Sequence, residues 1–133
     1  MKNTLILNKL SQVEPISEAY LTQLAHQAKI YWYQKNDADF CLDEAFILCP
    51  DPQIIVTSLV PLSQSTLQRA SHLEAIIATS TAVDYIDLTY CREQHIHVLH
   101  TPHYTEVAVA EHAFSLILAS TKHLRRLDAG LRH

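Results

Sequence analysis

The sequence contains a single glycine, Gly130, close to its C-terminal end. Natural chains average about 7% glycine, and glycine is the residue that lets a backbone approach a pyrophosphate closely. These residues therefore cannot form a glycine-rich phosphate-binding loop, whether of the G-x-G-x-x-G or the Walker type. The same shortage excludes the G-x-S-x-G turn that carries the nucleophile of many serine hydrolases.

The composition is that of an ordinary globular domain with one hydrophobic core. The 133 residues are 48% hydrophobic and 18% charged, with a formal net charge of −4. An acidic chain has no basic field to attract phosphate backbones or anionic lipids, so no nucleic-acid partner is expected. No membrane partner is expected either, because no apolar stretch approaches the ~20 residues of a spanning helix.

The cysteines indicate a reducing environment. There are three, Cys41, Cys49 and Cys91, an odd number without zinc-type or C-x-x-C spacing. Small buried hydrophobic side chains with reduced thiols are the simplest interpretation. No secretory h-region with a cleavage site follows the first ten residues, so a cytoplasmic protein is expected.

Apolar stretches alternate with amphipathic ones, a pattern typical of strands connected by helices in a parallel sheet. The β-branched and apolar runs predict strands at residues 4–7, 30–33, 54–58, 75–79 and 96–99. Helices are predicted from Ser17 to Ala28, with Tyr20, Leu21, Leu24 and Ala25 at helical spacing, and at residues 63–70 and 88–94. Residues 36–39 are expected to form a loop. The stretch 42–49 is ambiguous, and we interpret it as a short helix that ends before Pro50.

The last segment differs from the rest. Residues 106–127 contain neither proline nor glycine and carry a broad apolar stripe, formed by Val107, Ala110, Ala113, Phe114, Ile117, Leu118 and Leu124. A continuous helix of about 30 Å or more is predicted, at a rise of roughly 1.5 Å per residue. The basic cluster at residues 122–126 suits its C-terminal end, and Gly130 its stop. Such a helix needs a surface on which to bury its apolar stripe, either its own sheet or another subunit.

Three motifs follow one another in the second half of the chain. The first is I-I-V-T-S at 54–58 with Leu67 and the run 73–78, and the second is A-T-S-T-A-V-D-Y-I-D-L at 78–88. The third combines V-L-H-T-P at 98–102 with V-A-E-H at 109–112. In order and spacing they resemble segments of the D-isomer-specific 2-hydroxyacid dehydrogenases: two strands, the loop A-G-V-G-x-D-N-I-D-L, and the pieces V-x-N-x-P and V-A-E-H.

The resemblance implies an α/β fold, a flavodoxin-like parallel sheet with helices on both faces followed by a long C-terminal arm helix. It implies a substrate domain over residues 1–104 and an arm helix over 105–133 that leads towards a coenzyme domain absent from this chain. Complete members oxidise a D-2-hydroxy acid to a 2-oxo acid with NAD or NADP. Their catalytic arginine, histidine and acid follow the coenzyme motif, so we expect no catalytic residue here, no bound coenzyme and no activity alone. A homodimer is expected through Glu106 to Leu127.

The same resemblance places the substrate at two loops. Ser58 ends the third strand, and the loop after the fourth strand contains Thr79, Ser80, Thr81 and Ala82. In the family this loop presents backbone N–H groups to the substrate carboxylate, and its glycines permit positive φ. Ser80 and Ala82 replace those glycines here, and the hydroxyls of Ser80 and Thr81 could donate as well.

The segment after the fifth strand carries a further departure and the coenzyme contacts. His103 follows Pro102 where the family usually has glycine or aspartate. Glu106 and Val109 fall where related enzymes contact the nicotinamide end of NAD.

Structural roles remain open for these residues and their neighbours. Ser58 and Thr79 could merely terminate strands, and 80–82 could be an ordinary turn. Asp84 and Asp87 are expected to cap or brace the next helix rather than to act as acid and base. Structural hydrogen bonds are likewise expected of Glu111 and His112.

A metal site is the weaker interpretation of the histidines at positions 95, 97, 100 and 103, and exposed loop histidines are expected instead. An alternative function is a stand-alone flavodoxin-like module for dimerisation or regulation, without enzymatic activity. A phosphoacceptor receiver is disfavoured because Asn8 and Lys9 follow the first strand, where acidic residues are required.

Overall fold

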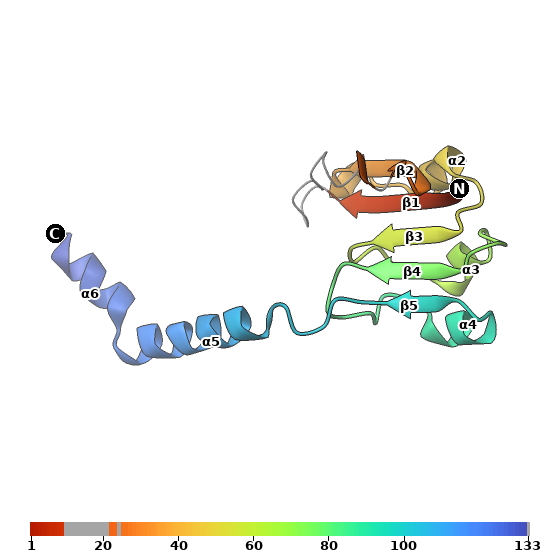
Figure 1. The fold of residues 1–133 in the computed structure, drawn as a ribbon. Helices are drawn as coiled ribbons and strands as arrows, with labels where there is room; N and C mark the ends of the chain where they lie inside the picture. The colour runs from red at the N-terminus through yellow and green to blue at the C-terminus, as the bar shows by residue number, and fades with distance from the viewer. Residues whose placement is uncertain (10–21, 24, 133) are drawn as a thin grey trace. The chain divides into compact units, whose positions relative to one another are not determined.

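The fold is described from a computed structural model, which covers residues 1–9, 22–23 and 25–132. The chain divides into two compact units, Met1–Pro102 and His103–His133. Among the residues described, the first unit contains the sheet and the helices that connect its strands, and the second contains two further helices (Figure 1). Each unit is described by itself.

The first unit is built on a five-stranded parallel sheet. Its strands are β1 (Lys2–Lys9), β2 (Ala28–Lys35), β3 (Ile54–Thr57), β4 (Ala75–Ala78) and β5 (His97–Leu99), in the order β2-β1-β3-β4-β5 (Figure 1). Every neighbouring pair is parallel, and the central register aligns Leu5 with Tyr31 and with Ile55. This is the flavodoxin-like order, in which the direction of winding reverses between β1 and β3. The predicted α/β class, a flavodoxin-like parallel sheet with helices, is confirmed.

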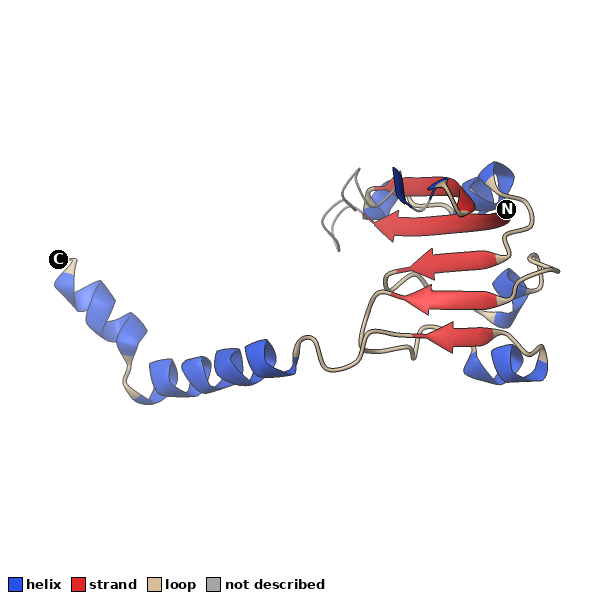
Figure 2. Cartoon of the chain, in the orientation of Figure 1, coloured by secondary structure: helices blue, strands red, loops and turns tan. Residues whose placement is uncertain are grey.

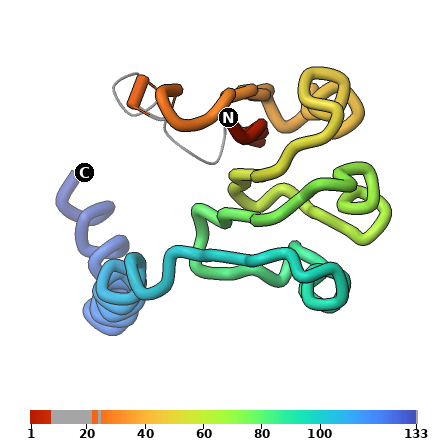
Figure 3. The backbone as a smooth tube through the Cα atoms, turned by 45° about the vertical axis from the view of Figure 1, so that its right-hand side comes forward, coloured from red at the N-terminus to blue at the C-terminus, as the bar shows by residue number. Residues whose placement is uncertain are grey.

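Three helices connect the strands and cover one face of the sheet. They are α2 (Leu42–Leu48), α3 (Gln64–Leu67) and α4 (Leu88–Glu93), and Figures 2 and 3 show them on the same side. Phe46, Leu67 and Cys91 project from these helices into one buried cluster with Leu5 and Ile76 of the strands. Because alternate residues of a strand face the same side, this cluster is the core of one face.

The other face of the sheet carries a groove of about 470 Å³, lined by Thr4, Ile6, Ile30, Val56 and Ile77 among others. Half of the helix predicted from Ser17 to Ala28, residues 17–21 and 24, lies outside the described residues, including Tyr20, Leu21 and Leu24. Of the remaining residues, 22, 23 and 25 are helical. Ala28 is not helical as predicted. It is the first residue of β2, because its backbone pairs with Lys2 of β1.

The remaining elements of this unit match the sequence with small differences at their ends. The stretch 42–49 is helical, as α2, and β1 and β2 are each eight residues long rather than four. The helix predicted at 63–70 is shorter, because α3 begins after its N-cap Ser63 and ends at Leu67. The predicted loop at 36–39 contains one 3-10 turn, η1 (Asp37–Asp39), closed by the N–H of Asp39 donating to the carbonyl of Asn36.

The second unit contains two helices, α5 (Glu106–Thr121) and α6 (Leu124–Leu131), so the prediction of one continuous helix over 106–127 is wrong. The break lies at His123, whose φ of 53° is left-handed. Histidine adopts this region more readily than most residues. The His123 carbonyl accepts the N–H groups of Arg126 and Leu127, which starts the new helix.

The break shortens the arm. With 16 residues, α5 is about 24 Å long. Gly130 was predicted to stop the helix, but it lies inside α6. None of the helices in the described part of the chain is long and apolar enough to cross a membrane.

Candidate functional site

The loops that follow β3, β4 and β5 are joined at the carboxyl edge of the sheet. Parallel strands end at the same edge, and hydrogen bonds connect the segments that follow them. The N–H of Thr79 donates to the carbonyl of Thr57 at 2.9 Å, and the N–H of Thr101 donates to the carbonyl of Ser80 at 3.2 Å. The predicted substrate loops therefore form one continuous rim.

The first of these loops begins with a strained residue. Ser58 is buried directly after β3, and Leu59, which is 44% exposed, has a φ of 53°. This left-handed conformation costs a non-glycine residue roughly 1–2 kcal/mol. Such strain persists only where the surrounding structure enforces it, and it is concentrated at functional sites. Ser58 is thus held in a fixed turn beside the point where the winding of the sheet reverses, which is where open α/β sheets bind ligands.

The loop after β4 is held by its own polar side chains. The buried Oγ of Ser80 donates to the carbonyl of Ala82 at 2.7 Å and lies 2.8 Å from the hydroxyl of Tyr85. The hydroxyl of Thr81 donates to the carbonyl of Thr101 at 3.3 Å. The hydroxyls of Ser80 and Thr81 are therefore already used within the protein.

The groups of this loop that have no partner are backbone N–H groups. None of residues 79–83 has a positive φ, so Ser80 and Ala82 adopt a conformation that needs no glycine. Among the described residues, the N–H groups of Ser80, Thr81 and Ala82 donate to no carbonyl or side chain, and Thr81 and Ala82 are exposed. Neighbouring N–H groups without partners can donate hydrogen bonds to a bound anion. These N–H groups are therefore candidate donors to an anion, in a loop whose conformation needs no glycine.

Hydrogen-bonded pairs of titratable side chains lie at the opposite edge of the sheet, where the strands begin. Asp51 precedes β3 and bonds to His72, and this hydrogen bond is the main reason that the pKa of Asp51 is lowered. Lys2 at the start of β1 pairs with Glu74, and its hydrogen bond lowers the pKa of the glutamate. Both of these hydrogen-bonded pairs belong to the amino edge, opposite the candidate site.

Asp87 has the structural role that the sequence predicts. Its carboxylate accepts the backbone N–H of Tyr90 at 3.0 Å and caps the first turn of α4. The histidines also have separate surroundings. The Nδ1 of His100 lies 3.0 Å from the carbonyl of Thr81 and must donate to it, while His97 is exposed on β5. No three His, Cys, Asp or Glu side chains in the described ranges are placed to share a metal ion.

Glu106 and Val109 lie in the second unit, at the start of α5. The carboxylate of Glu106 is 2.5 Å from the Nδ1 of His103, and both side chains are largely exposed. The N–H of Val109 donates to the carbonyl of Thr105 at 2.9 Å, and its side chain is 63% exposed. The two residues are one helical turn apart, so they share a side of the helix.

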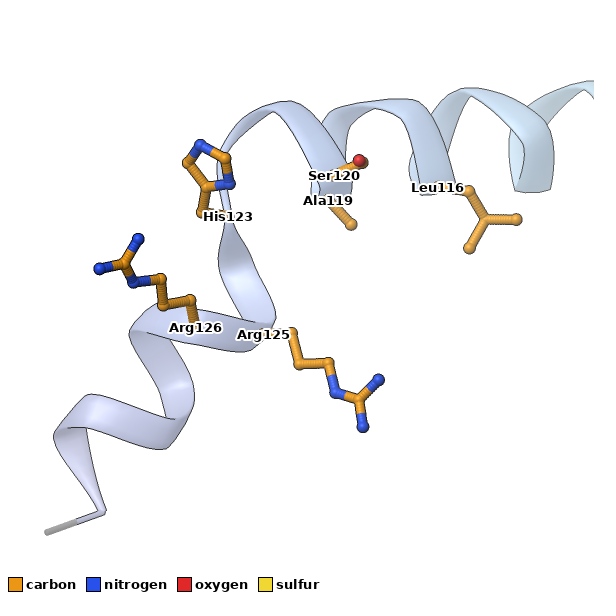
Figure 4. A pocket seen from close by; sticks show the side chains of 6 residues that line it. All are labelled: Leu116, Ala119, Ser120, His123, Arg125 and Arg126. Carbon is orange, nitrogen blue, oxygen red and sulfur yellow. The ribbon is translucent and has the colours of Figure 1, made fainter.

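A separate hollow of about 570 Å³ lies at the break between α5 and α6, lined by Leu116, Ala119, Ser120, His123, Arg125 and Arg126. Figure 4 shows the guanidinium groups of Arg125 and Arg126 pointing in different directions. They do not converge on one point, so this basic segment forms no anion clamp within its own unit.

Comparison with known proteins identifies the family. A family profile described as "D-isomer specific 2-hydroxyacid dehydrogenase, catalytic domain" matches residues 5–126. The chain belongs to this family. The hydroxypyruvate reductase of Thermotoga maritima is 29% identical over 91 residues, which are 68% of this chain and 30% of that protein. The D-3-phosphoglycerate dehydrogenase of Synechocystis is 30% identical over 86 residues, 62% of this chain and 16% of that protein.

Solved structures share the fold of this dehydrogenase-family chain. An acyclic imino acid reductase in complex with NADPH and D-Arg superposes with a TM-score of 0.80 at 22% identity, covering 99% of this chain and 41% of that one. A D-lactate dehydrogenase from Aquifex aeolicus, complexed with NAD and lactic acid, gives 0.73 at 23% identity, covering 96% and 37%. The chain thus spans less than half of the length of each of these relatives.

Two residues of the rim were not found from the sequence. The hydroxyl of Tyr85 contacts the substrate loop, and its signal was available, because the family motif has asparagine at this position. The left-handed turn at Leu59 had no signal, since leucine is not a residue that favours this conformation.

Proposed function

We propose that this chain provides the substrate-binding side of an NAD(P)-dependent 2-hydroxyacid dehydrogenase, an enzyme that interconverts a D-2-hydroxy acid and a 2-oxo acid. The family membership supports the reaction class, and the joined loops support the role of this domain. The observation that carries the proposal is the pair of unpartnered N–H groups at Thr81 and Ala82, two exposed residues at the carboxyl edge of a parallel sheet.

In this proposal the substrate carboxylate is bound by the backbone after β4, with Thr79, Ser80, Thr81 and Ala82 shaping the pocket. Ser58 forms the neighbouring wall, from the fixed turn after β3. The hydroxyl of Ser80 contributes indirectly, because it is buried and bonded to the carbonyl of Ala82. Backbone donors bind any 2-hydroxy or 2-oxo acid by the part that all of them share, so they define the class and not the individual acid.

The coenzyme is not assigned to a cradle within these residues. A side-chain carbon added at Gly130, the single glycine, would meet no atom within 4 Å, so no close approach is built there. The residues present therefore do not fit a dinucleotide pyrophosphate. NAD or NADP would be held by other residues of the complete enzyme, with Glu106 and Val109 as the proposed contacts at its nicotinamide end.

The arm supports a homodimer formed through Glu106 to Leu127. Large apolar side chains of α5 are exposed within their own unit, including Val107 at 71% and Phe114 at 67%. At 100° per residue, Val107 and Phe114 lie on one side of the helix, and Val109 and Leu116 lie on the opposite side. A helix that is apolar on opposite sides is normally buried. A second copy of the chain is the proposed cover for one of them.

The thiols support a reducing compartment such as the cytoplasm. None of the three cysteines is in a disulfide, and burial raises the pKa of Cys49 and of Cys91. Raised pKa values keep thiols protonated and unreactive.

The substrate role can be tested on this chain alone. Sodium pyruvate is the simplest 2-oxo acid whose reduction gives a chiral 2-hydroxy acid. Titration of the ¹⁵N-labelled protein with it should shift the amide signals of Ser58 and residues 79–83. Sodium chloride at equal ionic strength is the control. A well-dispersed spectrum in which these amides do not respond to pyruvate would refute the substrate role.

The dimer needs a separate test. Sedimentation equilibrium should give a dimer, and Phe114→Asp should give a monomer. Ile47→Asp is the matched control, because Ile47 is also exposed, at 77%, but lies on α2. A monomeric wild-type chain at high concentration would contradict the proposed dimer.

A further inference from the structure

Two departures from the family motif touch each other in this protein. Aligned on the closing D-x-I-D-L, the motif A-G-V-G-x-D-N-I-D-L has glycine where this chain has Ser80 and asparagine where it has Tyr85. The side-chain oxygens of these two residues are 2.8 Å apart. Ser80, which replaces the glycine, is therefore hydrogen-bonded to Tyr85, which replaces the asparagine.

The direction of this hydrogen bond follows from the number of protons. A serine hydroxyl has one proton, and that of Ser80 is donated to the carbonyl of Ala82 at 2.7 Å. The hydroxyl of Tyr85 must then donate to the Oγ of Ser80. Two consecutive hydrogen bonds therefore run from Tyr85 through Ser80 to the backbone carbonyl of Ala82.

Tyr85, where these hydrogen bonds begin, is held in place by the core and by its backbone. The ring of Tyr85 packs against the buried core. Its carbonyl accepts the N–H of Leu62 at 2.8 Å, and the N–H of Asp87 donates to the carbonyl of Leu62 at 3.0 Å. The hydroxyl therefore starts from a fixed position, and it can fix the loop.

Three carbonyls of the loop are engaged. Those of Ser80, Thr81 and Ala82 accept hydrogen bonds from Thr101, His100 and Ser80 respectively. The N–H groups of Ser80, Thr81 and Ala82 have no partner in the residues described. Each peptide unit is planar, so the carbonyls of Ser80, Thr81 and Ala82 also set the orientation of the next N–H groups, those of Thr81, Ala82 and Val83.

From this arrangement we infer that Tyr85 is a positioning residue for the substrate. Its hydroxyl acts through Ser80 to hold the carbonyl of Ala82, and with it the planar peptide unit of Ala82 and Val83, beside the N–H groups of Thr81 and Ala82 that bind a carboxylate. The inference rests on the proposed carboxylate-binding function and adds a residue that does not itself touch the substrate.

The test compares pyruvate binding by the wild-type chain and by Tyr85→Phe, which removes only the hydroxyl. The dissociation constant from the amide shifts of residues 79–83 should rise by about three- to tenfold, the range expected for loss of one neutral hydrogen bond. Tyr90→Phe is the matched control, since it removes a tyrosine hydroxyl from α4 of the same unit. The control should bind pyruvate like the wild type.

The outcomes separate the two levels of the proposal. If the wild type does not bind pyruvate at this loop, the substrate role fails and this inference fails with it. If the wild type and Tyr85→Phe bind equally, the substrate role stands and the positioning role is refuted. A weaker affinity together with an unchanged unfolding midpoint supports the positioning role, because a merely structural tyrosine would change stability and not pyruvate affinity.

A second comparison keeps the test decisive if Tyr85→Phe is unstable. Ser80→Ala removes the same connection from the loop side, and a double-mutant cycle with Tyr85→Phe measures whether the two act together. We expect the double variant to bind pyruvate no more weakly than Ser80→Ala alone. Two independent, multiplying losses would show that Tyr85 does not act through Ser80.

Discussion

Replacing Thr57 by valine should make the sheet unit more stable. The side chain of Thr57, at the end of β3, is 1% exposed, and its hydroxyl oxygen has no hydrogen-bond partner in the described part of the chain. A buried polar group without a partner costs about 1–3 kcal/mol. Valine has the same shape without the hydroxyl, so we expect the free energy of unfolding to rise by about 1–3 kcal/mol. For a unit of this size the Tm should increase by roughly 4 °C for each kcal/mol.

The assay is thermal and urea unfolding followed by circular dichroism on the full chain. Thr89→Val is the matched control, because Thr89 is exposed on α4, and its replacement should change stability by less than about 0.5 kcal/mol. Thr57→Ser retains the hydroxyl but removes a buried methyl group, so it should destabilise the unit. A destabilised Thr57→Val protein would show that the hydroxyl is hydrogen-bonded after all, contrary to this prediction.

Three further changes follow from the same structure. Leu59→Gly should be about 1 kcal/mol more stable to urea than Leu59→Ala, since glycine adopts the left-handed φ of 53° without strain; equal stabilities would show that the turn stores no strain. Asp87→Ala should lower the free energy of unfolding by about 1 kcal/mol, because α4 loses its capping hydrogen bond, and no loss in urea would contradict the cap. The lowered pKa of Asp51 means that its ionised form favours the folded state. That contribution is complete above the pKa of the unfolded carboxyl and is lost as the pH falls through the lower folded value. His72→Ala should therefore weaken the acid dependence of unfolding in that window, and an unchanged pH profile would exclude the coupling.

The sheet could be predicted from the sequence because each strand is a short apolar or β-branched run between turn residues. Such runs carry their own signal, as residues 54–57 and 75–78 illustrate. The break between α5 and α6 could not be predicted in the same way. It contains neither proline nor glycine, and it depends on the left-handed conformation of His123 alone.

The candidate site was predictable in its position and not in its chemistry. The motif at 78–88 located the loop, but the spacing does not reveal that the hydroxyl of Ser80 is buried and bonded to Ala82. The contact between Ser80 and Tyr85 forms only when the loop folds back onto the core. The sequence left both the backbone N–H groups and the hydroxyls of Ser80 and Thr81 as possible donors, whereas in the structure both hydroxyls are bonded within the protein.

In the proposed function the substrate binds to these residues and the coenzyme binds elsewhere in the complete enzyme. Calorimetric titration of the purified chain of 133 residues with NADH tests that division most directly. We expect no heat beyond dilution, because a chain whose one glycine lies in open space on α6 has no backbone cradle for a pyrophosphate. Saturable binding at micromolar concentration would contradict the account.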